Sequence, residues 1–219
     1  MGSTIKAVIF DMDGVLIDSE GLYKTLEQEL FEEVGARVGH EEHVSYQGSS
    51  NSVMWSLIKE KHHLAPSTEE LVRMTEEKVI DYFSSLAFID PMADVIELLD
   101  FLKARGVKIA LASSSSIDVI RLVLEKTGMK NYFEVVTDCT EAGAGKPDPA
   151  IFCLTQQKLG IPKENCVIIE DSTNGIRAAN AAGIYCIAFN GPGSEHQDQS
   201  ASKMIISKFA DLQQLPFGI

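Results

Sequence analysis

Short apolar runs alternate along this chain with amphipathic stretches, and this alternation restricts the folds open to it more than any other feature. Several runs are almost continuous in Val, Ile and Ala, as in strands that are buried on both faces of a parallel sheet. The strand-like runs cover residues 5–10, 107–112, 134–137, 167–169, 184–189 and, more weakly, 204–207. Their alternation with helical stretches predicts βαβ units in an α/β fold.

Helical stretches fill the spaces between these runs, and each of them is followed by a glycine. A glycine just past the last helical residue is a common end signal because it tolerates the left-handed conformation. The expected helices cover residues 92–105, 117–126, 150–159 and 174–182, followed by Gly106, Gly128, Gly160 and Gly183. Strands and helices in this order favour a Rossmann-like, doubly wound parallel sheet.

One stretch breaks the alternation, because residues 20–88 offer helical patterns and no convincing strand. Apolar residues recur there every fourth position, and Thr68 followed by two glutamates is typical of a helix start. The recurring positions are Leu22, Leu26, Leu30 and Val34 in one stretch, and Val53 and Leu57 in another. We expect an inserted α-helical cap domain at residues 18–88 and a Rossmann-like catalytic core at residues 1–17 and 89–219.

The composition excludes several classes of function. The chain has 219 residues, of which 45% are hydrophobic, enough for a globular core with a smaller insertion. Lys and Arg number 19 against 32 Asp and Glu, a formal net charge of −13 that offers no basic field for nucleic acid. The four cysteines form no Cys-x-x-Cys pair, and neither a signal segment nor a membrane-spanning run is visible. We therefore expect a cytoplasmic monomer without nucleic-acid or membrane partners.

Polar side chains follow four of the predicted strands, at the edge where parallel α/β sheets bind ligands. In chain order they are Asp11 and Asp13, then Ser113 and Ser114, then Lys146 in a Gly-Lys-Pro-Asp-Pro loop, then Glu170 and Asp171. Carboxylates beside a hydroxyl and a lysine can hold a phosphate next to a divalent cation, and oxygen ligands suit Mg²⁺. The order of these groups at successive strand ends therefore indicates phosphate chemistry.

These residue types suggest a role for each group. Asp11 is the candidate nucleophile that would form an aspartyl-phosphate, and Asp13 is the candidate general acid and then base. Lys146 would neutralise the phosphoryl oxygens, while Ser113 and the backbone of the serine run that includes Ser114 would hydrogen-bond them. Taken singly, each feature could be a helix cap, a turn or a surface lysine, and only their conjunction favours a catalytic site.

The motifs resemble those of the haloacid dehalogenase-like superfamily across essentially the whole chain. The matching residues are Asp11-Met12-Asp13-Gly14-Val15, Ser113, Lys146 and Glu170-Asp171. The Gly-Lys-Pro-Asp-Pro and Glu-Asp-Ser-x-x-Gly-Ile stretches are similar to the subgroup of β-phosphoglucomutase and small sugar-phosphate phosphatases. The resemblance implies a four-helix cap and Mg²⁺ bound by Asp11, the backbone carbonyl of Asp13, and Asp171, with Glu170 supporting the metal.

The second aspartate argues for phosphate esters, because an oxygen leaving group needs a proton and a halide does not. In the subgroup that this chain resembles, β-phosphoglucomutase has a cap arginine that binds the phosphate that is not transferred, and Asn51 stands at the matching position here. A cap histidine is similarly replaced by Tyr23, whereas a cap lysine is matched by Lys78. Because asparagine cannot replace a guanidinium, we predict a Mg²⁺-dependent phosphatase for a sugar or polyol phosphate. A β-phosphoglucomutase-type isomerase is the alternative, and a non-enzymatic scaffold is the third hypothesis.

The predicted cap should select the small phosphorylated metabolite. Its polar candidates are His40, His43, Gln47, Asn51 and Lys78. Residues 40–43 and 61–63 fit solvated helix ends better than substrate contacts, and Trp55 fits the interior of the cap better than a stacking position on a sugar. We interpret residues 18–20 as the exit into the cap rather than part of the site. Joints near residues 17–21 and 87–91 are expected to let the cap open and close.

Overall fold

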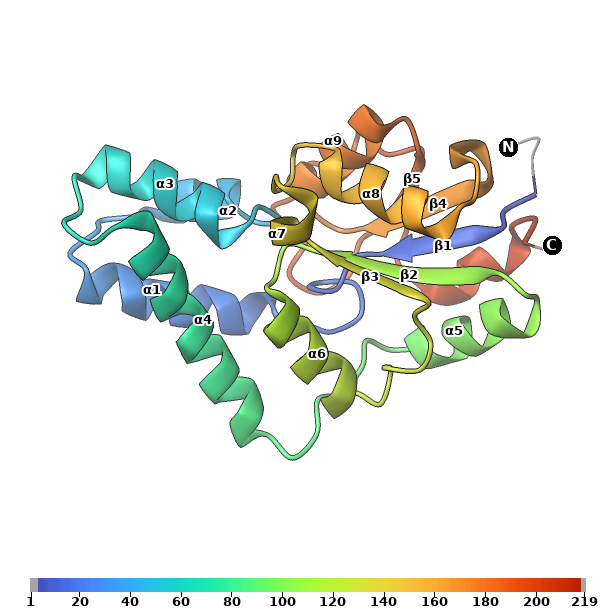
Figure 1. Ribbon diagram of the computed structural model, residues 1–219, viewed down its shortest axis with the longest axis horizontal. Helices are drawn as coiled ribbons and strands as arrows, with labels where there is room; N and C mark the ends of the chain where they lie inside the picture. Colours follow the sequence, from blue (N-terminus) through green and yellow to red (C-terminus); the bar gives the residue numbers. More distant parts are fainter. Residues whose placement is uncertain (1–3, 218–219) are drawn as a thin grey trace.

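Six parallel strands form the central sheet of the computed structural model, which describes residues 4–217 (Figure 1). The strands are β1 (Ala7–Phe10), β2 (Lys108–Ser113), β3 (Val135–Asp138), β4 (Cys166–Glu170), β5 (Tyr185–Phe189) and β6 (Met204–Ile206). Their order in the sheet is β3-β2-β1-β4-β5-β6, so the chain winds outward in both directions from the β1–β4 pair. The predicted α/β fold with a doubly wound parallel sheet is confirmed, and the site lies at the switch point.

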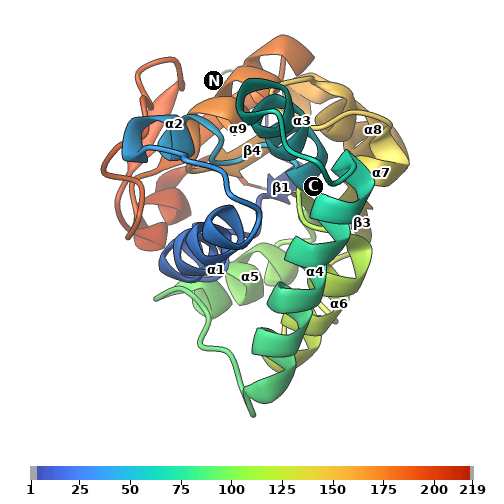
Figure 2. The same cartoon turned by 90° about the vertical axis from the view of Figure 1, so that its left-hand side faces the viewer.

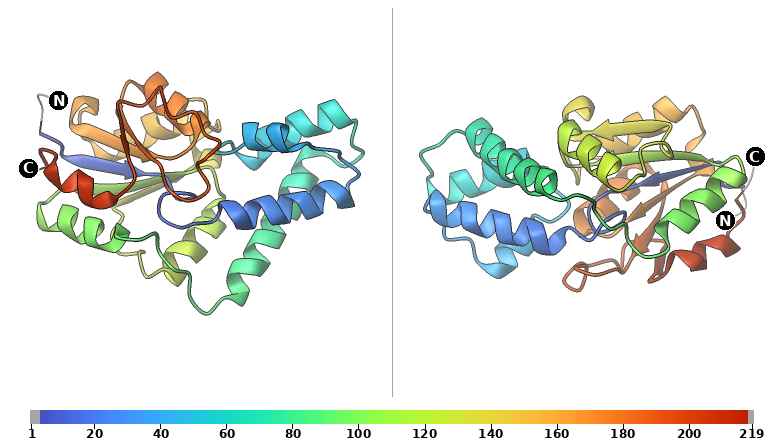
Figure 3. Two further views of the ribbon diagram at one scale, coloured as in Figure 1. Left: turned by 180° about the vertical axis from the view of Figure 1, so that it is seen from behind. Right: turned by 90° about the horizontal axis from the view of Figure 1, so that it is seen from below.

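Side chains of the strands alternate between two apolar layers. Val8 and Phe10 join the layer on one face, and Ala7 and Ile9 join the layer on the other. The first face is covered by α5 (Val95–Ala104), α6 (Ile117–Lys126) and the 3₁₀ helix η2 (Phe209–Gln214), and the second by α8 (Ala150–Leu159) and α9 (Thr173–Ala182) (Figures 1 and 3). Two short elements, α7 (Cys139–Ala142) and η1 (Lys163–Asn165), complete this part. Burial on both faces explains the nearly continuous apolar runs.

The four glycines that were expected to follow helices all have positive φ angles, between 66° and 74°. Helices α8 and α9 end directly before two of them, as predicted. Helix α5 begins at Val95, three residues later than predicted, because Asp94 before it has a left-handed φ of 62°. A right-handed helix cannot include that conformation.

Helices of one chain segment stand beyond the carboxyl ends of the strands, as Figures 1 and 2 show. They are α1 (Glu20–Glu33), α2 (His40–Ser45), α3 (Asn51–His62) and α4 (Thr68–Ser85), and we call residues 20–85 the helical insertion. The insertion has its own apolar cluster, which includes Leu30, Trp55 and Ile58. That cluster supports the predicted domain division at residues 18 and 88, which itself stays a prediction.

Helix α3 turns a different face inward from the one its four-residue spacing suggested. Leu57 is 47% exposed, whereas Met54, Trp55 and Ile58 are buried. The indole Nε1 of Trp55 donates to Thr75 Oγ1 at 2.7 Å, which satisfies its polar atom inside the insertion. Trp55 is therefore part of the apolar core of the insertion and not a stacking platform for a sugar.

Within residues 4–217, the helices include none with the length and apolar character needed to cross a membrane.

Candidate active site

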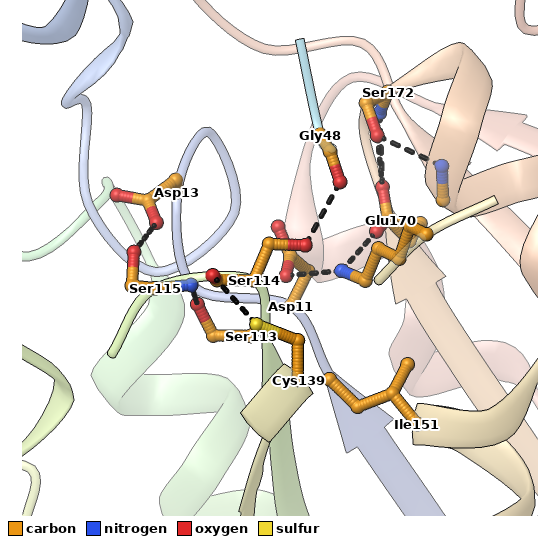
Figure 4. Close-up of polar contacts among 12 residues, drawn as sticks. Asp11, Asp13, Gly48, Ser113, Ser114, Ser115, Cys139, Ile151, Glu170 and Ser172 are labelled. Atoms are coloured by element: carbon orange, nitrogen blue, oxygen red, sulfur yellow. Dashed lines mark hydrogen bonds and ion pairs between the residues drawn. The ribbon is translucent and has the colours of Figure 1, made fainter. Parts of the chain in front are cut away.

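Buried carboxylates and a lysine meet beyond the carboxyl ends of β1 and β4. One carboxylate oxygen from each of Asp11, Glu170 and Asp171 lies within 4.8 Å of the other two. Lys146 reaches them from the loop between α7 and α8, and its Nζ donates to Asp11 Oδ1 and Glu170 Oε1 at 2.6 Å each (Figure 4). The lysine is 0% exposed, so these two ion pairs compensate a fully buried charge.

The cluster contains more carboxylate than Lys146 can neutralise. Burial raises the pKa of Asp11 to about 8, against the opposing charge of Lys146. Burial acts to lower the pKa of Lys146, but the charges of Asp11 and Glu170 outweigh it and raise that pKa above its ordinary value. The surplus of negative charge can be relieved by a proton on Asp11 or by a divalent cation, and the all-oxygen donor set fits a hard cation.

Two glycines let the backbone pass close to these carboxylates. A Cβ atom on Gly14, whose φ is +77°, would lie 2.2 Å from Asp171 Oδ2. A Cβ atom on Gly175 would lie 1.8 Å from Glu170 Oε1. The side chain of Glu170 is fixed further by Ser172, whose backbone N and Oγ donate to Oε2 at 3.0 and 2.9 Å. These contacts explain the glycines of the first and fourth motifs.

Asp13 lies beside the cluster and is held by two hydroxyl groups. Its carboxylate accepts hydrogen bonds from Ser19 Oγ at 2.6 Å and from Ser115 Oγ at 2.9 Å. Burial raises the pKa of Asp13, although both hydroxyls act in the opposite direction. Ser19 is 1% exposed and contacts Asp13, so the interpretation of residues 18–20 as an exit outside the site is wrong for Ser19.

Sequence reasoning also missed Ser115, because four consecutive serines carry no signal that ranks them. The structure separates their contacts. Ser113 is buried and its Oγ accepts from the backbone N of Ser115 at 3.1 Å, while Ser114 Oγ donates to the carbonyl of Gly48 at 2.9 Å (Figure 4). Ser115 also exchanges a hydrogen bond with the hydroxyl of Tyr23 at 3.1 Å. The serine run thus joins the core to the helical insertion.

A cavity of about 250 Å³ lies between the carboxylate cluster and the helical insertion. On the core side it is lined by Asp11, Asp13, Ser114, Lys146 and Asp171, and on the insertion side by residues that include Tyr23, Glu27, His43 and Asn51. Lys78 is not among the described residues that line it. The Lys78 ammonium lies 3.5 Å from Glu33 and 3.9 Å from Glu29, both on α1. The structure therefore does not bring Lys78 into the site.

The insertion wall includes two further polar candidates of the predicted cap, His40 and Gln47. His43 is 7% exposed, so the interpretation as a solvated helix end is wrong for it. Lys61 and His62 instead contact Glu42. Glu27 was missed, although it lies one helical turn after Tyr23. Glu195 and His196 were also missed, and extending the strand-end rule to β5 would have found them.

The last residue of α2 and its connection to α3, residues 45–50, dock onto the core, and we call them the docking segment. Asn174 Nδ2, at the start of α9, donates to the backbone carbonyls of Ser45 at 3.1 Å and Gln47 at 2.8 Å, and to Ser49 Oγ at 3.2 Å. Gly48, with a φ of +74°, passes so close that a Cβ atom would lie 2.1 Å from Ser172 Oγ. These contacts hold the insertion over the cavity.

Comparison with known proteins is consistent with this geometry. The family model described as haloacid dehalogenase-like hydrolase matches residues 5–183. A phosphorylated carbohydrates phosphatase of Thermotoga maritima is 33% identical over 180 residues, 82% of each chain. Hexitol phosphatase B of Escherichia coli is 27% identical, over 88% of this chain and 86% of its own. A solved β-phosphoglucomutase of Clostridium difficile has a TM-score of 0.83 at 27% identity, with 95% of this chain and 93% of that chain covered. The chain belongs to the haloacid dehalogenase-like hydrolase family, among its β-phosphoglucomutase-like members.

Proposed function

We propose that this protein is a phosphatase that hydrolyses the phosphomonoester of a small metabolite, a sugar or polyol phosphate. The observation that carries the proposal is the buried group of Asp11, Glu170, Asp171 and Lys146. Three of its members, Asp11, Asp171 and Lys146, line one cavity together with Asp13. Relatives named as phosphatases of phosphorylated carbohydrates and of hexitols support the substrate class.

The acidic cluster is also suited to a magnesium ion. Asp11 and Asp171 would hold Mg²⁺ together with the backbone carbonyl of Asp13, and Glu170 would support them. When bound, the ion would screen the repulsion between an anionic phosphate and the Asp11 carboxylate. Lys146 donates to the same carboxylate and would neutralise phosphoryl oxygens that enter the cavity.

In the first step, the Asp11 carboxylate would attack phosphorus while the bond between phosphorus and the leaving oxygen breaks. Asp13 would give its proton to that oxygen, so that a neutral alcohol departs and an aspartyl-phosphate remains. In the second step, Asp13 would take a proton from a water molecule that attacks phosphorus, which releases inorganic phosphate and restores Asp11. A raised pKa suits Asp13 to hold a proton closer to neutral pH than an ordinary aspartate.

Phosphate release from p-nitrophenyl phosphate and from a panel of sugar, polyol and nucleotide monophosphates tests this proposal. We expect release that requires Mg²⁺, is lost in EDTA and falls by about 10³-fold or more in Asp11→Asn. Asp118→Asn is the matched control, because its side chain is 74% exposed and outside the site. Absence of Mg²⁺-dependent release, or full activity in Asp11→Asn, would contradict the proposal.

A phosphomutase is the second candidate, since a β-phosphoglucomutase shares the fold and the reaction would use the same nucleophile. A mutase must hold a second phosphate, and the neutral Asn51 lines the cavity where the resemblance places the arginine of that enzyme. Incubation with β-glucose 1-phosphate separates the two. Glucose 6-phosphate without free phosphate would favour the mutase, and free phosphate the phosphatase.

A further inference from the structure

The helical insertion contributes a fixed carboxylate–imidazole pair to the cavity wall. His43 Nε2 of α2 contacts Glu27 Oε2 of α1, and the two side chains are only 9% and 12% exposed. Both residues line the cavity. The pair therefore faces the space that a leaving group would occupy when its phosphate lies at Lys146.

Aromatic side chains hold this pair in place. The ring of Phe31 packs edge-to-face on His43 with 5.1 Å between centroids, and it packs in the same way on Trp55 at 5.4 Å. A charged or polar pair set against an apolar cluster costs desolvation free energy, so it adds little to stability. A polar pair that is rigid, partly buried and adjacent to a cavity is better explained by ligand recognition.

The charge of the pair limits the leaving groups it can accept. With His43 neutral the pair carries one negative charge, and with His43 protonated it carries none, so in neither state does it offer a surplus of positive charge. Glu195 at the exposed rim and Lys24 also line the cavity, and their opposite charges cancel, so the pair together with these two residues carries no surplus of positive charge in either state. A carboxylate accepts hydrogen bonds from hydroxyl groups and repels anions, and an imidazole can donate to or accept from a hydroxyl.

We propose that Glu27 and His43 together determine substrate specificity, by hydrogen-bonding hydroxyl groups of an uncharged, polyhydroxylated leaving group and by rejecting a leaving group with a second anionic group. This inference rests on the proposed phosphatase function and specifies its substrate class. The attractive element is the pair of hydrogen-bonding groups, and the repulsive element is the Glu27 charge.

The test compares kcat/KM for a sugar monophosphate and for its bisphosphate, fructose 6-phosphate and fructose 1,6-bisphosphate, in the wild-type protein and in Glu27→Gln. Glutamine keeps the size and an acceptor oxygen but removes the charge. We expect the wild-type protein to prefer the monophosphate and Glu27→Gln to lose about tenfold of that preference, since charge rejection is removed. Glu29→Gln is the control, because Glu29 lies on the same helix with a side chain 58% exposed.

A second variant keeps the inference testable if Glu27→Gln does not fold. His43→Gln should raise KM for the monophosphate by about tenfold, with a smaller effect on kcat, because it removes an orienting hydrogen bond to the leaving group. An unchanged ratio of the two substrates in Glu27→Gln, or an unchanged KM in His43→Gln, would overturn the inference. Failure of the wild-type protein to hydrolyse p-nitrophenyl phosphate would instead overturn the phosphatase proposal, so the two failures are distinguishable.

Discussion

Replacement of Lys146 by methionine should destabilise the protein strongly. The lysine is completely buried, and its Nζ lies 2.6 Å from both Asp11 Oδ1 and Glu170 Oε1. Methionine fills a similar volume but carries no charge, so Lys146→Met leaves two buried carboxylates without their cation. Breaking a buried ion pair by removing one partner costs about 3–5 kcal/mol.

The size of the loss should depend on pH. The pKa of Asp11 is about 8 with Lys146 present, and removal of the Lys146 charge raises it further, so Asp11 can take up a proton at lower pH and relieve part of the repulsion. We therefore expect Lys146→Met to cost about 3 kcal/mol near pH 6 and about 5 kcal/mol near pH 9 in metal-free buffer. With a urea m-value of about 3 kcal/mol per M, the unfolding midpoint should fall by about 1 M and about 1.7 M, respectively.

Urea unfolding followed by circular dichroism in EDTA measures these midpoints. Lys78→Met is the matched control, because Lys78 is 34% exposed and its two carboxylate partners lie at 3.5 Å or more, so a loss within about 1 kcal/mol is expected. Adding Glu170→Gln to Lys146→Met should recover about 2 kcal/mol, because it removes one of the stranded charges. The reasoning is refuted if Lys146→Met matches the wild-type midpoint at both pH values, or if the double variant recovers nothing.

Three further results are expected. In EDTA, the free energy of unfolding should fall as pH rises from about 4 to about 8, because folded Asp11 keeps a proton that the unfolded chain, with an ordinary pKa of 3.8, has released. Asp11→Asn should make the free energy of unfolding depend less on pH in urea titrations, and an unchanged pH dependence would contradict the raised pKa of Asp11. Asn174→Ala removes three hydrogen bonds to the docking segment. Limited proteolysis within residues 45–50 should therefore accelerate, and KM for a sugar monophosphate should rise. An unaltered cleavage rate would show that these hydrogen bonds do not hold the segment on the core. Gly175→Ala should lower the free energy of unfolding by about 2 kcal/mol or more, measured by thermal or urea unfolding, because its methyl group would overlap the Glu170 carboxylate. Gly21→Ala, with open space around it, should not lower the free energy of unfolding. Equal effects of the two variants would exclude the steric explanation.

The sequence predicts most of the sheet and of the acidic cluster for a local reason. Buried parallel strands have apolar runs in the sequence. Their carboxyl ends lie at one edge of the sheet, so groups that follow them, such as Asp11 and Glu170, come close together. The contacts of Ser19 and Ser115 with Asp13 depend on how two loops fold over one carboxylate, and spacing carries no signal for that. The pairing of Glu27 with His43 depends likewise on how α1 packs against α2.

The sequence also did not predict which face of each helix in the insertion points inward. A four-residue apolar spacing in α3 suggested that Leu57 faces inward, yet the helix buries Met54, Trp55 and Ile58. Lys78 was placed at the substrate through resemblance, and its ammonium lies instead beside carboxylates of α1. Short helices with mixed patterns are oriented by tertiary packing, which a single sequence does not record.

The docking segment has a consequence for how such enzymes diversify. Asn174 and Ser114 bind it through the backbone carbonyls of Ser45, Gln47 and Gly48, which every amino acid provides. The core therefore binds this segment largely through its backbone, with glycine required at position 48 and side-chain contacts at Ser49 and Gln47. An insertion with different cavity-lining residues that kept this backbone shape would meet the same donors, Asn174 and Ser114, so the wall facing the substrate could change while Asp11, Asp13 and Lys146 stay in place.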